Sequence, residues 1–243
     1  MVIKIIAEIG SNWEGDIELG KLHIKKSRES GASLVKFQMW RARDLYDESH
    51  HNWNDIVRSE LKEEYAKELK NYADKIGIEW FCSVFYPEAV DFLESIGVPL
   101  YKIASRTSRL VDKFSLETIG AVAKTKKPTF ISTGEGADKE KIMKLFPTGI
   151  AQFTYCVSKY PTQDNEIDWH QIKNYNFFSD HTLGITIPIV YATLRRQLVK
   201  EDIFIEKHVK LDNSVGADAF FAISYNELSD LVKHLKRIDD LNL

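Results

Sequence analysis

Two histidines in this sequence each follow a short apolar run, and together they could bind a metal ion. His181 lies in FFSDHTLGI at residues 177–185, and His208 lies in IFIEKHVKLD at residues 203–212. Neutral imidazoles are common ligands of divalent transition metals, and a pair of them leaves positions open for water or substrate oxygens. Lone histidines are more often structural, so this prediction depends on a fold that brings the two runs together.

Two lysines interrupt apolar runs, where a charged side chain needs a partner. Lys36 lies in LVKFQ, and Lys102 lies in YKIAS. A single lysine near the end of a strand more often extends its ammonium group into water. Two buried ammonium groups, however, require a counter-charge. A small dianionic ligand would supply it, so the pair predicts an anion site.

A stretch rich in hydroxyl groups and glycine, ISTGEGADKE, follows another apolar run at residues 131–140. Its hydroxyl groups and free backbone N–H groups could hold a carboxylate or a phosphate. An ordinary glycine-rich loop would show the same pattern, so both interpretations stay open.

Short apolar runs recur about every 30 residues and predict eight strands, at 3–9, 33–38, 78–83, 100–105, 128–133, 150–156, 175–180 and 202–208. Between these strands lie charged segments in which the apolar residues have helical spacing. In PEAVDFLESIG, Pro87 suits the first helical position and Gly97 suits the position after the end. Ser224 and Glu227 predict a capping box for a last helix that reaches about Asp239.

This alternation predicts an α/β fold, a single (β/α)8 TIM barrel that spans residues 1–243 as one domain. A doubly wound open sheet is the alternative. Such a sheet commonly carries GxGxxG after its first strand, and the sequence there is EIGSNWEG.

In a barrel the carboxyl ends of all strands meet at one rim, which is where barrel enzymes carry out their chemistry. The predicted strand ends carry polar or reactive side chains, namely Glu8, Lys36, Gln38, Ser83, Lys102, Ser105, Ser132, Thr133, Cys156, Ser158, Asp180, His181, Glu206 and His208. Since His181 and His208 leave adjacent strands, their imidazoles could reach a common point.

Composition argues against several classes of protein. The net charge of -3 and the pI of about 6.2 leave no basic stripe for a nucleic-acid backbone. Cys82 and Cys156 lie in apolar runs without CxxC spacing, which is typical of reduced thiols in the cytosol. No window approaches the roughly 18 uncharged apolar residues of a membrane span, and no signal peptide is evident. We therefore expect a cytoplasmic protein without nucleic-acid or membrane partners.

The sequence resembles the sialic acid synthase (N-acetylneuraminate synthase) family over nearly its whole length. The resemblance is carried by six motifs in order: IAEIGSNWEGDIELGKLHIKKSRESGASLVKFQMW, FLESIGVPLYKIAS, KPTFISTGE, KYPT, FSDHTLGI and IEKHVKLD. It implies a (β/α)8 barrel that condenses phosphoenolpyruvate with an aldehyde sugar of the N-acetylmannosamine type. It also implies a divalent metal, manganese first and magnesium or cobalt as alternatives, and the release of phosphate with formation of a 2-keto acid.

The resemblance assigns roles motif by motif. It implies that His181 and His208 hold the metal, and that Glu8, Lys36 and Lys102 act in catalysis. By the same resemblance, the hydroxyl groups that bind phosphoenolpyruvate beside the lysines are those of Ser105, Ser132, Ser158 and Ser179. The residues implied to contact the acceptor sugar are Gln38, Tyr160 and Asp218.

The sequence departs from the family pattern at Val84, Arg106 and Thr107, and also at residues 215–218, where VGAD replaces PGPD. Val84 in CSVFYPE replaces a hydroxyl residue, so one contact to phosphoenolpyruvate is expected to be missing. Arg106 replaces a glycine and Thr107 replaces a glutamate that touches the acceptor, which predicts an altered acceptor site. Arg106 could grip an anionic group of the acceptor, or it could turn outward into a surface ion pair.

The sequence also ends after the predicted eighth helix. We therefore expect no C-terminal antifreeze-like domain, which in typical members crosses a homodimer and supplies an arginine to the partner's sugar site. A homodimer remains possible.

Three functions stay open at this point. The chain could be a short synthase with an altered acceptor, a non-catalytic relative that binds phosphoenolpyruvate or a sugar phosphate, or another metal-dependent barrel enzyme such as an aldolase. The absence of a carboxylate at Thr107 favours the second, whereas the presence of both histidines and both lysines favours the first.

Overall fold

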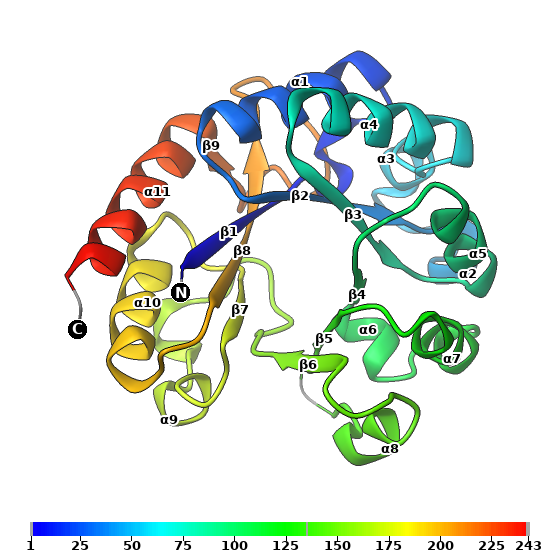
Figure 1. Ribbon diagram of the computed structural model, residues 1–243. Coiled ribbons are helices and arrows are strands. Elements are labelled where there is room, and N and C mark those ends of the chain that lie inside the picture. The colour runs from blue at the N-terminus through cyan, green and yellow to red at the C-terminus, as the bar shows by residue number, and fades with distance from the viewer. Residues whose placement is uncertain (1, 135, 242–243) are drawn as a thin grey trace.

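The computed structural model describes residues 2–134 and 136–241, and its parallel strands curl into a barrel surrounded by helices (Figure 1). All eight predicted strands are present: β1 (Ile3–Glu8), β2 (Leu34–Met39), β3 (Glu79–Val84), β4 (Tyr101–Ile103), β5 (Thr129–Ser132), β6 (Ala151–Thr154), β7 (Phe177–Asp180) and β8 (Ile203–Lys210). The hydrogen-bonded order runs β6-β5-β4-β3-β2-β1-β8-β7.

Tyr155 closes the barrel between β6 and β7. Its N–H donates to the Phe177 carbonyl, and its carbonyl accepts from the Ser179 N–H, both at 2.9 Å. The predicted (β/α)8 barrel is therefore confirmed.

Helices cover the outside of the barrel. The longer ones are α1 (Ile17–Glu29), α4 (Glu63–Ile76), α5 (Pro87–Ser95), α7 (Ser115–Thr125), α10 (Thr186–Leu198) and α11 (Tyr225–Asp240). The predicted end signals are confirmed: Pro87 occupies the first turn of α5, and the capping box of Ser224 and Glu227 starts α11. Across residues 2–134 and 136–241, no helix is long and apolar enough to cross a membrane.

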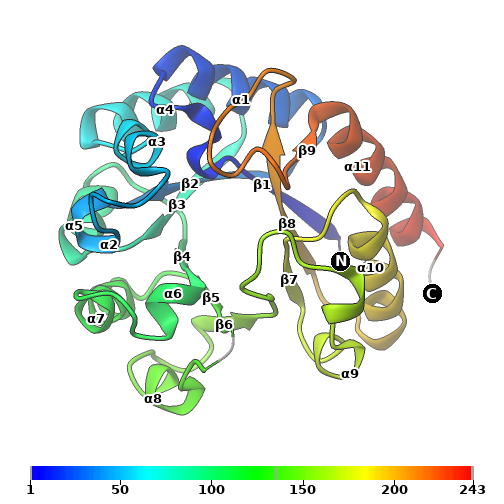
Figure 2. The same ribbon diagram turned by 180° about the vertical axis from the view of Figure 1, so that it is seen from behind.

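Shorter elements occupy the connections. They are η1 (Gly10–Trp13), α2 (Ala42–Leu45), α3 (Trp53–Arg58), α6 (Ser105–Ser108), α8 (Lys139–Met143), η2 (Asp164–Glu166), α9 (Trp169–Ile172) and β9 (Ile223–Ser224). The periodicity did not predict α2 and α3, which pack around Trp40, Ile56 and Phe85 in a small separate cluster. The loop between β8 and β9 (orange in Figure 2) is hydrogen-bonded to η1 through Asp218 and Ser11.

The inside of the barrel changes from apolar to charged along the strands. A cluster of Ile6, Leu34, Phe81, Phe130 and Phe177 fills its lower part. Because side chains alternate along a strand, the next inward-facing residue lies two positions further on each strand. Those positions hold Glu8, Lys36, Ser83, Ser132 and Ser179.

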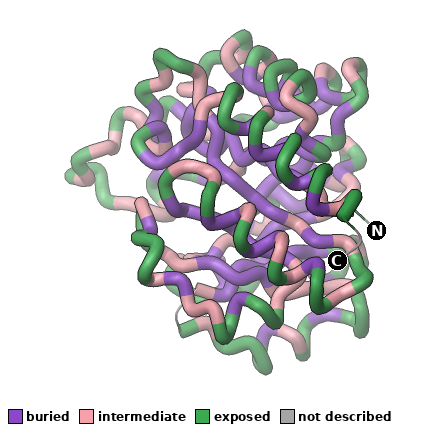
Figure 3. The backbone as a smooth tube through the Cα atoms, turned by 90° about the vertical axis from the view of Figure 1, so that its left-hand side faces the viewer, coloured by how far each residue is buried: buried purple, intermediate pink, exposed green. Residues whose placement is uncertain are grey.

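The outward-facing strand residues form the main core with the helices. Val35, Phe37 and Trp80 belong to this layer and are fully buried. Figure 3 shows the same arrangement, with buried segments through the middle of the molecule and exposed segments on the helices. The two-sided packing fixes each strand, so the polar residues at the strand ends have a rigid support.

Candidate active site

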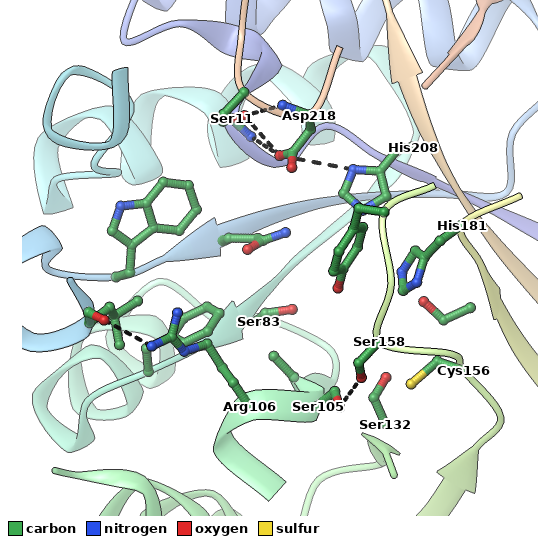
Figure 4. Close-up of a pocket in the computed structure, with 18 of the residues that line it drawn as sticks. Ser11, Ser83, Ser105, Arg106, Ser132, Cys156, Ser158, His181, His208 and Asp218 are labelled. Atoms are coloured by element: carbon green, nitrogen blue, oxygen red, sulfur yellow. Dashed lines mark hydrogen bonds and ion pairs between the residues drawn. The ribbon is translucent and has the colours of Figure 1, made fainter. Parts of the chain in front are cut away.

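A cavity of about 680 Å³ opens at the carboxyl ends of the strands (Figure 4). Every predicted site residue except Glu8 and Thr107 lines it: Lys36, Gln38, Lys102, Ser105, Arg106, Ser132, Ser158, Tyr160, Ser179, His181, His208 and Asp218. The cavity wall therefore combines residues of six barrel strands, β2, β3, β4, β5, β7 and β8, with residues of the connections that follow the strands.

A buried layer of charge forms the floor of this cavity. Lys36 Nζ lies 3.0 Å from Glu8 Oε2 and 3.0 Å from Glu206 Oε2, while Lys102 Nζ lies 3.2 Å from Glu206 Oε2. Lys102 Nζ also lies 4.2 Å from the centre of the ring of Phe177, which belongs to the apolar cluster below the charged layer. Two protein carboxylates, Glu8 and Glu206, therefore already supply the counter-charge that the two lysines were expected to require.

Glu206 was predicted to lie at a strand end, but the sequence analysis gave it no role in the site. Its Oε1 accepts a hydrogen bond from Ser179 Oγ at 2.7 Å, and its Oε2 faces both lysines. Glu206 lies two residues before His208 on β8, and side chains two apart share one face of a strand. That spacing was the available signal that Glu206 points into the same cavity.

Burial and neighbouring charges shift the pKa values in this layer. Burial, with help from Glu206, raises the pKa of Glu8 to about 7 against the opposing effect of Lys36. Burial also lowers the pKa of Lys102 to about 8. Although burial alone would raise the pKa of Glu206, the ammonium groups of Lys102 and Lys36 hold it below its usual value. A proton near neutral pH therefore resides on Glu8 rather than on Glu206.

Glu8 lies behind the cavity wall rather than in it. Gln38, which does line the cavity, donates from Nε2 to Glu8 Oε1 at 2.6 Å. Glu8 therefore contacts the cavity only indirectly, by holding the side chains of Gln38 and Lys36 in place.

Hydroxyl groups gather on the wall formed by the ends of β4, β5 and β6. The Oγ atoms of Ser105 and Ser158 lie 2.6 Å apart, and Ser132 Oγ lies 3.1 Å from Thr154 Oγ1. Gly134 packs against this group so closely that a Cβ there would collide with Ser105 Oγ and come within 2.6 Å of Ser158 Oγ. The predicted ISTGEG stretch thus contributes to a cradle of small polar groups, although Glu135 within it lies outside the described residues.

The two histidines face each other across β7 and β8, with ring centres 5.8 Å apart. His181 Nδ1 donates to the Val157 carbonyl at 2.7 Å, which leaves Nε2 as the unprotonated nitrogen. His208 Nδ1 is buried without a hydrogen-bond partner and lies 4.0 Å from Asp218 Oδ2. Burial lowers the pKa of His181 to about 4 and that of His208 to about 3, so both rings are neutral at pH 7.

Two neutral imidazoles with uncommitted nitrogens fit a divalent metal ion. Among residues 2–134 and 136–241, no group of three or more His, Cys, Asp or Glu side chains is arranged to hold an ion. A metal held by His181 and His208 would therefore take its other ligands from water or substrate.

Asp218 reaches the cavity from the loop between β8 and β9. Its Oδ2 accepts hydrogen bonds from Ser11 N–H and Ser11 Oγ, both at 2.8 Å, which tie this loop to η1. Ser11 also lines the cavity, and the sequence assignment did not include it. At the mouth, the Tyr160 ring packs 4.4 Å from the His181 ring, measured between centres.

Val84 and Thr107 do not occupy the cavity. Val84 packs into the outer core, and the preceding residue, Ser83, points inward and accepts a hydrogen bond from Lys36 Nζ at 3.0 Å. Strand β3 therefore still supplies a hydroxyl group to the cavity. Thr107 is 1% exposed and absent from the cavity wall, which corrects the expectation that it touches the acceptor. Residues 105–108 form the helical turn α6, and the helical rotation turns Thr107 away from the cavity side that Ser105 and Arg106 occupy.

Arg106 lines the cavity, but two of its nitrogens already have partners. Nε donates to both carboxylate oxygens of Asp112, at 3.0 and 2.8 Å, and Nη2 donates to the Leu45 carbonyl at 2.9 Å. The side chain of Asp112 is only 5% exposed, so this is not the surface ion pair considered from the sequence.

Known proteins with the same architecture place this site in a family. The sequence matches the NeuB family over residues 23–242. It is 28% identical over 262 residues to N-acetylneuraminate-9-phosphate synthase of Mus musculus, covering 97% of this chain and 70% of that protein. It is 29% identical over 261 residues to pseudaminic acid synthase of Helicobacter pylori, covering 96% of this chain and 74% of that protein.

A solved structure agrees with these relatives. N-acetylneuraminic acid (sialic acid) synthetase from Leptospira borgpetersenii, crystallised in complex with citrate, superimposes with a TM-score of 0.87 at 25% identity. The alignment covers 99% of this chain and 85% of that one. The resemblance seen in the motifs is thereby confirmed, and the chain belongs to the NeuB family.

Proposed function

We propose that this chain condenses phosphoenolpyruvate with an aldehyde sugar, releases inorganic phosphate and forms a 2-keto-3-deoxy sugar acid. Membership of a family of synthases supports an enzyme of this class. The observation that carries the proposal is one cavity in which two buried lysines and a group of serines lie beside two histidines.

Phosphoenolpyruvate carries a carboxylate and a phosphate, and the cavity offers donors for both. The ammonium groups of Lys36 and Lys102 lie on its floor, and the hydroxyl groups of Ser105, Ser132 and Ser158 lie on one wall. Charge-assisted hydrogen bonds at both ends of the ligand would hold its enol carbon in one orientation.

The protonated, neutral form of Glu8 favours the binding of such an anion. When Glu8 is neutral, the layer of Lys36, Lys102, Glu8 and Glu206 carries a net positive charge, and when Glu8 ionises that charge is cancelled. A bound dianion therefore stabilises the protonated form of Glu8. Glu8 is the group in this layer suited to hold and release a proton during the reaction.

His181 and His208 would hold a divalent metal ion, for which we propose manganese, with magnesium or cobalt as alternatives. When bound, the ion would polarise the aldehyde carbonyl of the acceptor. Gln38, Tyr160 and Asp218 surround the same part of the cavity and would orient the acceptor.

The reaction balances with these groups alone and water. The enol carbon attacks the aldehyde carbon and forms the new C–C bond. Water adds at C2 of the former phosphoenolpyruvate, and the C–O bond to the phosphate then breaks. Phosphate leaves with the bridging oxygen, and a 2-keto acid remains.

We further propose that the acceptor carries an anionic group. The guanidinium groups of Arg106 and of the exposed Arg109 both line the cavity. Guanidinium groups bind phosphate and carboxylate through paired N–H donors. An anionic group on the acceptor would accept hydrogen bonds from these guanidinium groups when the acceptor binds.

The test is a phosphate-release assay with phosphoenolpyruvate, Mn²⁺ and a panel of neutral, phosphorylated and carboxylated aldoses. We expect release only when an aldose is present, and faster release with an anionic aldose. Binding of phosphoenolpyruvate without turnover would favour the non-catalytic relative, and condensation with free pyruvate would favour an aldolase. If neutral N-acetylmannosamine is the best substrate, the anionic acceptor is wrong while the reaction class stands.

A further inference from the structure

A buried ion pair stands next to the two histidines but outside the cavity. Lys207 Nζ lies 2.7 Å from Asp180 Oδ2, and the two side chains are 1% and 0% exposed. Neither residue lines the cavity. The pair therefore takes no direct part in binding a ligand there.

The register of β7 and β8 places this pair one residue before both histidines. Asp180 and Lys207 are direct partners across the parallel strands. Because side chains alternate, the pair points outward to the helices, whereas His181 and His208 line the cavity. An ion pair thus joins the two strands immediately before the two proposed ligands.

The same pair also holds the residue after His181. Asp180 Oδ1 accepts a hydrogen bond from the Thr182 N–H at 2.9 Å, and Lys207 Nζ donates to the Thr182 carbonyl. The His181 carbonyl itself accepts from the Thr162 N–H at 3.0 Å. The backbone around His181 is therefore anchored on both sides.

We propose that Asp180 and Lys207 are positioning residues that fix His181 relative to His208, so that both imidazoles reach one divalent ion. This inference rests on the proposed metal site. Burying two charges costs desolvation free energy that a pair of apolar residues would avoid, so stability is a weak account of the pair. Because the pair holds the backbone on both sides of His181, we assign it the role of fixing the position of that imidazole. Groups behind metal ligands commonly change metal affinity by about 10- to 100-fold.

The test compares the native chain with the double variant Asp180→Asn/Lys207→Met, which removes both charges and leaves neither unpaired. Free Mn²⁺ is counted by electron paramagnetic resonance, and phosphoenolpyruvate binding is measured by calorimetry in the absence of metal. We expect the Kd for Mn²⁺ to rise at least about tenfold, while the Kd for phosphoenolpyruvate stays near the native value.

A matched control uses Arg196 and Asp239, an ion pair of low exposure that joins α10 to α11 at 2.7 Å. Arg196→Met/Asp239→Asn should lower the melting temperature and leave the Kd for Mn²⁺ unchanged. Native Mn²⁺ affinity in Asp180→Asn/Lys207→Met, or an equal loss in the control, would overturn the proposal.

A single variant decides the question if the double variant does not fold. Asp180→Asn keeps the shape of the side chain and the acceptor for the Thr182 N–H, but it removes the charge that pairs with Lys207. We again expect the Kd for Mn²⁺ to rise at least about tenfold, and a native Kd would overturn the proposal. A native chain that does not bind Mn²⁺ would overturn both this inference and the proposed metal site. Phosphate release from phosphoenolpyruvate tests the proposed reaction separately.

Discussion

Lys102 is the charged residue of the cavity floor whose removal leaves the remaining carboxylates paired. In Lys102→Met, Glu206 keeps its contact with Lys36 at 3.0 Å, and Glu8 keeps its contact with the same ammonium group. We expect the variant to fold and to bind phosphoenolpyruvate more weakly by roughly 1.5–3 kcal/mol, the cost of one charge-assisted hydrogen bond. Calorimetry measures this, with the exposed Lys67→Met as control. Equal affinity in both variants would remove Lys102 from the binding site.

Glu8 makes the stability of the protein depend on pH. Its pKa is about 7 in the fold against 4.5 for an unperturbed carboxyl, so the folded state binds the proton more tightly. The stabilisation is complete below about pH 4.5 and is lost as the pH rises through 7. Lys36, Glu206 and Gln38 are the groups that face it.

The variant Glu8→Gln cannot lose that proton. We therefore expect the melting temperature of Glu8→Gln, relative to the native chain, to increase between pH 5 and pH 8. Thermal melts at both values measure the difference. Parallel profiles would show that Glu8 has an ordinary pKa.

The residues that bear charge could be predicted from the sequence, but their partners could not. Lys36, Lys102, His181 and His208 each interrupt or end an apolar run, and this pattern is visible in one dimension. The contact between Lys102 and Glu206 joins residues 104 apart in the chain and exists only once β4 and β8 face each other across the barrel. The sequence shows which side of a strand a residue occupies, not what it meets there.

At the scale of elements, strands were predictable and short helical turns were not. The strands have apolar runs bounded by turn residues, which is a strong signal. The turn α6 has only Ser105–Ser108, too short for any periodicity, and it decides that Thr107 faces the wall while Arg106 faces the cavity. The same limit applies to α2 and α3, whose short helices pack with residues of other segments around Trp40 and Phe85.

The end of β5 offers a direct test of the hydroxyl cradle. Gly134 has a φ of +32° and its missing Cβ leaves room for Ser105 and Ser158, whereas Gly136 has a φ of +87° and nothing within 4 Å. Gly134→Ala should displace both serines and weaken phosphoenolpyruvate binding by at least about 1.4 kcal/mol, a factor of ten. Gly136→Ala shares the backbone strain and should lower stability alone. Calorimetry with both variants separates the two effects, and equal binding would exclude the cradle.

At the scale of the whole molecule, the barrel stacks a charged layer on an apolar floor. Phe81, Phe130 and Phe177 exclude water from below, and the lysines and carboxylates lie above them. A low local dielectric strengthens each ion pair and each contact to a ligand. The regular alternation of strands and helices in the sequence was enough to predict the barrel. It also predicted which polar residues lie at the carboxyl ends of the strands. The cavity mouth depends on long connections whose packing the sequence pattern does not reveal.

The most direct measurement of the proposed reaction follows the oxygen that bridges carbon and phosphorus in phosphoenolpyruvate. The chain is incubated with Mn²⁺, an accepted aldose and phosphoenolpyruvate labelled at that atom with a heavy oxygen isotope, and both products are analysed by mass spectrometry. We predict one keto acid per phosphate, heavier than the aldose by the elements of pyruvic acid, with the label in the phosphate. A label retained in the keto acid, or phosphate released without a keto acid, would contradict the account.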